Sequence, residues 1–138
     1  MMDDVLINKA AIIERCIKRI KEEYIGHESE FDSNFVRQDS IILNLQRACE
    51  AAIDMGMRLI RIKQLGLPQS SRDVFAMLEA ATLIDHLLSK SLQAMVGFRN
   101  IAIHDYKKMN LEIVRHIIQE NLNDLSTFAQ IALKTALP

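Results

Sequence analysis

The amino-acid sequence predicts an all-α fold, an up-and-down bundle of about five helices that forms a single domain over residues 1–138. Apolar residues recur at spacings of three and four through most of the chain, which is the period of a helix with one buried face. Only four glycines and two prolines interrupt this pattern. Hydrophobic residues make up 49% of the chain and charged residues 25%, so a chain of this length can bury one core.

The first helix is predicted from Val5 to about Tyr24, where apolar residues line one face and lysines and glutamates occupy the others. The segment from Gly26 to Asn34 has no sustained period and is rich in residues that form turns and helix caps. We therefore expect a loop between the first and second helices.

The second helix is the longest that the pattern predicts. It starts between Ser33 and Asp39 and runs to about Leu65, where Gly66 and Pro68 end it. Two apolar stripes run along this helix side by side, so we expect it to pack against two neighbours.

Two shorter helices are predicted next. The first centres on Val74–Leu78 and is capped by Ser70 or Ser71. Thr82, followed three residues later by Asp85, resembles a capping box that opens the second.

The last helix is predicted from Leu111 to about Thr135, with Asn110 as its candidate cap. Residues 106–110 form the turn before it. Short connections of this kind favour antiparallel neighbours.

Composition also limits the function. The formal net charge is −1 and the pI is near 6.4, which excludes a surface that is basic all over, so any contact with RNA must be local. Cys16 and Cys49 both fall at apolar positions, which favours buried thiols in a reducing compartment. No apolar run approaches ~18 residues and the N-terminus lacks a basic leader, so we expect a cytoplasmic protein without membrane contact.

Several polar groupings outside the main cluster are weaker candidates. His86 and His116 have no cysteine or carboxylate at ligand spacing, so we expect no metal site, and nothing in the chain indicates a cofactor. Glu50 and Asp54 lie four residues apart beside Arg47. This spacing allows an acidic pair, but an ion-paired helix face is its more frequent cause.

The candidate site is a polar cluster within residues 96–106 that contains Arg99, Asn100, His104 and Tyr106. If it lies near a helix end, Asn100 and His104 share a face, and the long side chain of Arg99 can reach the same patch. A guanidinium group matches a phosphate group, and a histidine can take or give a proton near neutral pH. An arginine and a histidine at this spacing also occur by chance, and the histidine then simply binds a carbonyl group.

Such a cluster suits the cleavage of RNA. That reaction needs a base at the 2′-hydroxyl, an acid at the leaving oxygen and charge stabilisation at the phosphate, but no metal. One histidine fills only one of the two proton-transfer roles. We therefore expect a symmetric homodimer that brings two copies of Arg99 and His104 into one cleft.

The cluster resembles the Arg-x4-His-x-Tyr signature of HEPN-domain toxins of the HepT type, which are all-helical ribonucleases. Segments 44–54, 67–72 and 95–98 also resemble this family, so the similarity covers most of the chain. The resemblance implies a HEPN-like fold and a metal-independent endoribonuclease that dimerises. It also implies a partner encoded beside it, a MntA-type nucleotidyltransferase antitoxin.

Carried over to this chain, the resemblance implies that Arg99 holds the scissile phosphate, that His104 transfers protons and that Asn100 orients the histidine or the backbone. It further implies that the antitoxin transfers AMP from ATP onto Tyr106. The added phosphate and adenosine would repel and block RNA, which neutralises the toxin. Two alternatives stay open: a non-catalytic helical module that positions substrate for a nucleotidyltransferase, and a helical dimer whose polar edge is only structural.

Overall fold

Side-chain caps begin most helices of this protein, as the sequence pattern predicts. In the computed structural model, which describes residues 3–137, the side chains of Asn34, Ser70 and Asn110 each accept a hydrogen bond from a backbone N–H of the following helix. The elements in chain order are α1 (Asp4–Tyr24), η1 (Glu28–Glu30), α2 (Phe35–Lys63), α3 (Ser71–Ala80), α4 (His86–His104), η2 (Tyr106–Lys108), α5 (Leu111–His116), η3 (Ile117–Asn121) and α6 (Leu122–Thr135).

The start of α4 differs from the sequence prediction. Thr82 is not a cap but lies in a turn with a φ of 60°. The cap is Asp85, whose Oδ1 accepts a 2.8 Å hydrogen bond from the backbone N–H of Leu88. Because a carboxylate is itself a strong cap, the helix starts at this residue and not three residues earlier.

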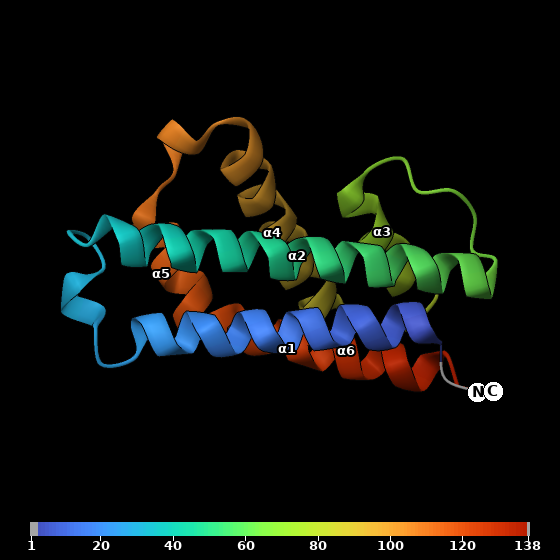
Figure 1. The fold of residues 1–138 in the computed structure, drawn as a ribbon. Helices are drawn as coiled ribbons and strands as arrows, with labels where there is room; N and C mark the ends of the chain where they lie inside the picture. Colours follow the sequence, from blue (N-terminus) through green and yellow to red (C-terminus); the bar gives the residue numbers. More distant parts are fainter. Residues whose placement is uncertain (1–2, 138) are drawn as a thin grey trace.

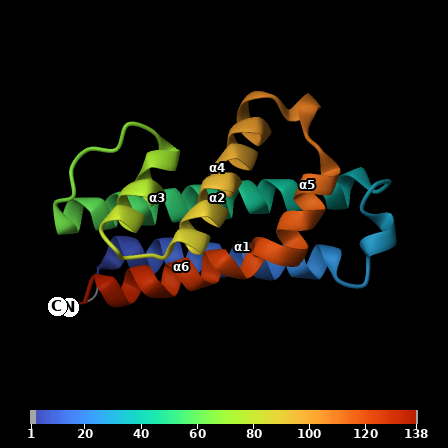
Figure 2. The ribbon, with the colours of Figure 1, turned by 180° about the vertical axis from the view of Figure 1, so that it is seen from behind.

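Three long helices form the body of the bundle. α1 and α2 lie side by side and run in opposite directions, and α6 packs against both (Figure 1). α4 crosses α2 obliquely, and its C-terminal end rises out of the bundle together with η2 (Figure 2). The predicted all-helical bundle is confirmed, and it leaves the end of α4 projecting on one side.

The apolar faces meet in one core. Its largest fully buried side chains include Phe31, Phe75 and Phe128, and the rings of Phe75 and Phe128 pack edge to face with centroids 5.4 Å apart. Cys16 and Cys49 are buried and free, which confirms the interpretation of these residues as packed thiols. Among the described residues, no helix has the length and apolar character needed to cross a membrane.

α3 approaches α2 very closely at Gly56. A Cβ atom at this position would lie 2.5 Å from Cγ1 of Val74, a buried side chain of α3. Glycine inside a helix is less favourable than alanine by about 1 kcal/mol. The close approach explains its presence here, and it fixes the place of α3 and of Ser71 at its first turn.

The last predicted helix is interrupted, which corrects the sequence prediction. It divides into α5 and α6 at η3, a π-helical turn. Ile117 and Leu122 are both buried although they lie five residues apart, a spacing that fits a π turn and not an α-helix. α5 therefore points away from α6 toward the loop between α1 and α2 (Figure 2), where Arg115 contacts Asp32 at 2.7 Å.

Candidate functional site

The polar cluster lies on the last two turns of α4 and on η2. One face of α4, which includes Phe98 and Ala102, is buried in the core. Asn100 and His104 lie one helical turn apart on exposed surface, as the spacing predicts. The helix ends at Asp105, whose backbone leaves the helical conformation with a φ of −153°.

Arg99 is partly buried and binds α3. Its Nη2 donates a 2.9 Å hydrogen bond to Oγ of Ser71. Burial raises the pKa of the Cys49 thiol on α2 to about 12, and the nearby charge of Arg99 opposes this rise. Nε of Arg99 is buried and has no hydrogen-bond partner within residues 3–137. Because a buried donor without an acceptor destabilises a protein by about 1–3 kcal/mol, an anion that reached this nitrogen would be bound favourably.

Arg72 brings a second guanidinium group to α4. A Cβ atom on residue 97 would lie 2.4 Å from Nη2 of Arg72, so this side chain passes over the helix at Gly97. Arg72 is exposed and follows Ser71, the residue that binds Arg99. The sequence pointed to Arg72 only through segment 67–72, which is one of the segments that carry the family resemblance.

Tyr106 is bound to α2. Its hydroxyl donates a 2.6 Å hydrogen bond to Oδ1 of Asp39, a residue 67 positions earlier. The pKa of Tyr106 is raised to about 12 by partial burial, by this hydrogen bond and by the negative charge of Asp39. The two residues line a depression of about 320 Å³ together with Ile42, Leu43 and Gln46 of α2. No local signal in the sequence pointed to Asp39.

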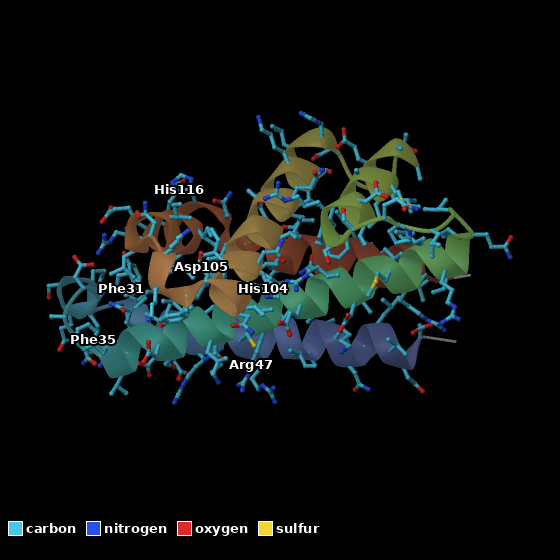
Figure 3. The ribbon with its side chains drawn as sticks, turned by 90° about the horizontal axis from the view of Figure 1, so that it is seen from above. Phe31, Phe35, Arg47, His104, Asp105 and His116 are labelled. Carbon is cyan, nitrogen blue, oxygen red and sulfur yellow. The ribbon has the colours of Figure 1, made fainter. Side chains whose placement is uncertain are left out.

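The structure separates the members of the cluster within one chain. Arg99 is directed to α3 and Tyr106 to α2, although the sequence led us to expect Arg99 beside Asn100 and His104. Figure 3 shows His104 next to Asp105, at the end of α4. One chain thus offers a fixed guanidinium group, an exposed imidazole and an accessible phenol, a set that can bind a phosphate and move a proton.

Comparison with known proteins places the chain in a known family. The family described as "Ribonuclease HepT-like" matches residues 13–132, a span that contains the whole cluster. A relative from Shewanella oneidensis, described as mRNA nuclease HepT, is 52% identical over 130 residues, which cover 94% of this chain and 97% of the relative.

Solved structures agree with this match. One is a tri-AMPylated Shewanella oneidensis HEPN toxin in complex with an MNT antitoxin, with a TM-score of 0.89 and 52% identity, covering 94% of this chain and 97% of that chain. Another is a toxin–antitoxin structure with AMP-PNP, with a TM-score of 0.89 and 51% identity, covering 95% and 99% of the two chains. Fold, sequence and span agree, and the chain belongs to the HepT-like ribonuclease family.

Proposed function

We propose that this protein is the toxin of a toxin–antitoxin pair and an endoribonuclease that cleaves RNA without a metal ion. The observation that carries the proposal is the 52% identity to an mRNA nuclease over 94% of the chain. RNA is the substrate, and a MntA-type nucleotidyltransferase is the antitoxin. Two buried free thiols fit a cytoplasmic protein.

In this proposal the catalytic residues are Arg99 and His104. Arg99 binds the scissile phosphate. Its buried Nε, which lacks a partner among the described residues, supports this role. His104 is exposed and moves a proton between RNA and solvent. Asn100 lies one turn before His104 on the same face and orients the histidine or the RNA.

The cleavage reaction needs both a base and an acid, so we propose that two copies of the chain form a homodimer around one cleft. The surface around His104 supports this because it carries partly exposed apolar residues, Ile101 and Ile103. Apolar side chains of this kind are typical of a surface that becomes covered by a partner.

The dimer is tested with a charge at the proposed interface. Ile103→Glu is expected to give a folded monomer that no longer cleaves RNA. Val5→Glu is the matched control, because Val5 is 44% exposed and Ile103 is 41% exposed. Sedimentation analysis measures the mass, and an active Ile103→Glu monomer would contradict the shared cleft.

The catalytic role is tested with purified protein, labelled RNA and a chelator of divalent ions. His104→Ala is expected to lower kcat/KM by at least about 100-fold because a positioned acid or base contributes that much. His86→Ala is the control, since His86 is an exposed histidine of the same helix. Cleavage by His104→Ala at the wild-type rate would remove His104 from the mechanism. Wild-type protein that binds the nucleotidyltransferase but cleaves no RNA would favour the non-catalytic module.

We further propose that the antitoxin neutralises the protein by AMP transfer to Tyr106. The phenol oxygen attacks the α-phosphate of ATP, pyrophosphate leaves, and the phenol proton passes to a base. The chain has two tyrosines. Tyr24 is 5% exposed and accepts a hydrogen bond from Gln119, whereas Tyr106 is 44% exposed. Only Tyr106 is open to a modifying enzyme in the folded protein.

Mass spectrometry tests this assignment after incubation with the antitoxin and ATP. The peptide that contains Tyr106 is expected to gain whole AMP units and RNA cleavage is expected to fall. Tyr106→Phe should remain unmodified and active, whereas Tyr24→Phe should be modified like the wild type. AMP found on the Tyr106→Phe protein would place the modification elsewhere.

A further inference from the structure

A groove between α1 and α2 gathers positive charge outside the polar cluster. It has a volume of about 510 Å³. Four of its lining residues are cations, three from α1 and one from α2: Arg15, Lys18, Arg19 and Arg47. Positions 15, 18 and 19 share one helical face, so α1 presents these side chains together.

One acidic residue, Glu22, also lines the groove, so the lining carries four cations and one anion. Arg19 forms loose ion pairs with Glu22 at 3.5 Å and Glu23 at 3.9 Å. Within residues 3–137, Arg15, Lys18 and Arg47 form no ion pair. The groove is therefore a local positive patch on a chain whose formal net charge is −1.

The ion pairing predicted for Glu50 and Asp54 beside Arg47 is found at Asp54 but does not involve Arg47. Asp54 contacts Lys9 of α1 at 2.9 Å, and Glu50 accepts a 3.3 Å hydrogen bond from Gln46. Neither Glu50 nor Asp54 therefore pairs with Arg47, and the Arg47 side chain lines the groove. Its charge and that of Arg15 both oppose the rise in the pKa of the Cys16 thiol that burial causes, so the two arginines approach the same point from different helices.

One stretch of α2 separates this groove from the depression at Tyr106. Ser40, Asn44 and Arg47 line the groove, whereas Asp39, Leu43 and Gln46 line the depression. In Figure 3, Arg47 lies on the side of α2 that faces α1, and His104 lies on the other side. A flexible polyanion that leaves the site at His104 would therefore meet the groove after crossing a single helix, a width of about 10 Å.

We propose that this groove, lined by Arg15, Lys18, Arg19 and Arg47, is a second binding site that holds the phosphate backbone of the RNA strand next to the cleavage site. The inference rests on the proposed ribonuclease function. All lining side chains are charged or polar, and Ser40 and Asn44 add neutral hydrogen-bonding groups. The absence of aromatic rings from the lining means that bases do not stack there, so binding is independent of sequence.

The lining favours RNA over an acidic protein as the occupant. Protein interfaces rely on buried aromatic and apolar anchors, and this groove offers none. A nucleic-acid backbone needs only cations and hydrogen-bond donors at intervals along a track, which is what the two helices supply.

The first test measures RNA binding in the His104→Ala background, which keeps the strand intact. Lys18→Glu and Arg47→Glu are each expected to raise the Kd for single-stranded RNA about five- to tenfold, whatever its sequence. Each should also lower the slope of log Kd against log salt by about 0.7, because one phosphate contact is lost. Lys90→Glu, which makes the same charge change on an exposed residue of α4, is the control and should bind like its parent.

The second test separates this groove from the cleavage site. In the active protein, Lys18→Glu and Arg47→Glu should lower kcat/KM for a long RNA about five- to tenfold. Cleavage of a dinucleotide, which fills only the cleavage site, should stay unchanged. Circular dichroism confirms that these surface variants are folded.

The outcomes distinguish the two proposals. Long-RNA binding and cleavage that match Lys90→Glu would overturn the groove and leave the ribonuclease function in place. Wild-type protein that neither binds nor cleaves RNA would overturn both. Variants that bind RNA normally but lose the antitoxin would show a protein-binding surface and would likewise overturn the inference.

Discussion

The hydroxyl of Tyr106 donates a 2.6 Å hydrogen bond to the carboxylate of Asp39. This contact joins η2, beside the candidate catalytic histidine, to the N-terminal part of α2. The phenol must remain protonated to donate. Transfer of AMP to the oxygen would remove the donor and place a phosphate charge near a carboxylate, so modification would break this contact.

Asp39→Asn is expected to lower the pKa of Tyr106 from about 12 toward the ordinary value. Ionised Tyr106 faces the negative charge of Asp39, and the amide removes that charge. The measurement is tyrosinate absorbance against pH in a Tyr24→Phe background, since the sequence has only two tyrosines. Identical titration of Tyr106 before and after the Asp39→Asn change would contradict this cause.

The same shift predicts how stability depends on pH. The folded state favours the neutral phenol of Tyr106. Its contribution to the free energy of unfolding is therefore complete below the ordinary pKa of about 10, and it is lost as the pH rises toward about 12. Between these values the wild type should lose more stability than Tyr106→Phe. Urea unfolding at several pH values measures the difference, and parallel curves for the two proteins would count against it.

Gly56→Ala is expected to destabilise the protein by about 1–3 kcal/mol, although alanine favours helices more than glycine does. The new methyl group would lie 2.5 Å from Val74. Val74→Ala should relieve the overlap, so the double variant should be more stable than the sum of the two single changes predicts.

Gly97→Ala is the control for this experiment. There the methyl group meets the flexible end of Arg72 at 2.4 Å, which can move away. Thermal unfolding should show little loss for Gly97→Ala and a clear fall in Tm for Gly56→Ala. Equal falls in Tm at the two positions would show that the close approach of α3 does not require glycine at position 56.

Ser71→Ala is expected to lower kcat/KM for RNA about five- to tenfold while the protein stays folded. Its Oγ holds Nη2 of Arg99 at 2.9 Å, so the guanidinium group would lose its orientation. Ser29→Ala, on the exposed surface of η1, is the control. Full activity of Ser71→Ala would mean that Arg99 needs no such support.

Cys49 is expected to resist alkylation in the folded protein. Burial raises its pKa to about 12, so the reactive thiolate is scarce near neutral pH, and the buried sulfur is also out of reach of the reagent. Mass spectrometry should find label on Cys49 only after unfolding in denaturant. Fast labelling of native Cys49 would show that the core around this thiol opens to solvent.

Local signals in the sequence were sufficient for most of the fold. Asn34, Ser70 and Asn110 are residues that cap helices, and each caps one here. Most of the periodic apolar residues are buried because burial depends on the helical face, whereas Val5 and Leu87 lie on exposed surface. The π turn was not predicted, since Ile117, Ile118 and Leu122 fit an unbroken helix equally well until the neighbours of each are known.

The site was less predictable because its contacts join distant parts of the chain. The cluster of Arg99, Asn100, His104 and Tyr106 is visible in sequence, but the partners Ser71 and Asp39 are 28 and 67 residues from the side chains that they bind. Arg47 was interpreted from its neighbours on the same helix, whereas its surroundings are set by α1.

The π turn before α6 also decides how the stretch around Tyr106 is held. α5 is not a rigid extension of α6, and it takes its own anchorage from Arg115, which binds Asp32 and lies 5.3 Å above the ring of Phe31. Residues 105–110 therefore join α4 to α5, a helix whose position depends on the loop between α1 and α2. Substitution of Asp32 or Phe31 would therefore act on residues 105–110 through α5, without a direct change in the packing of α1 against α6.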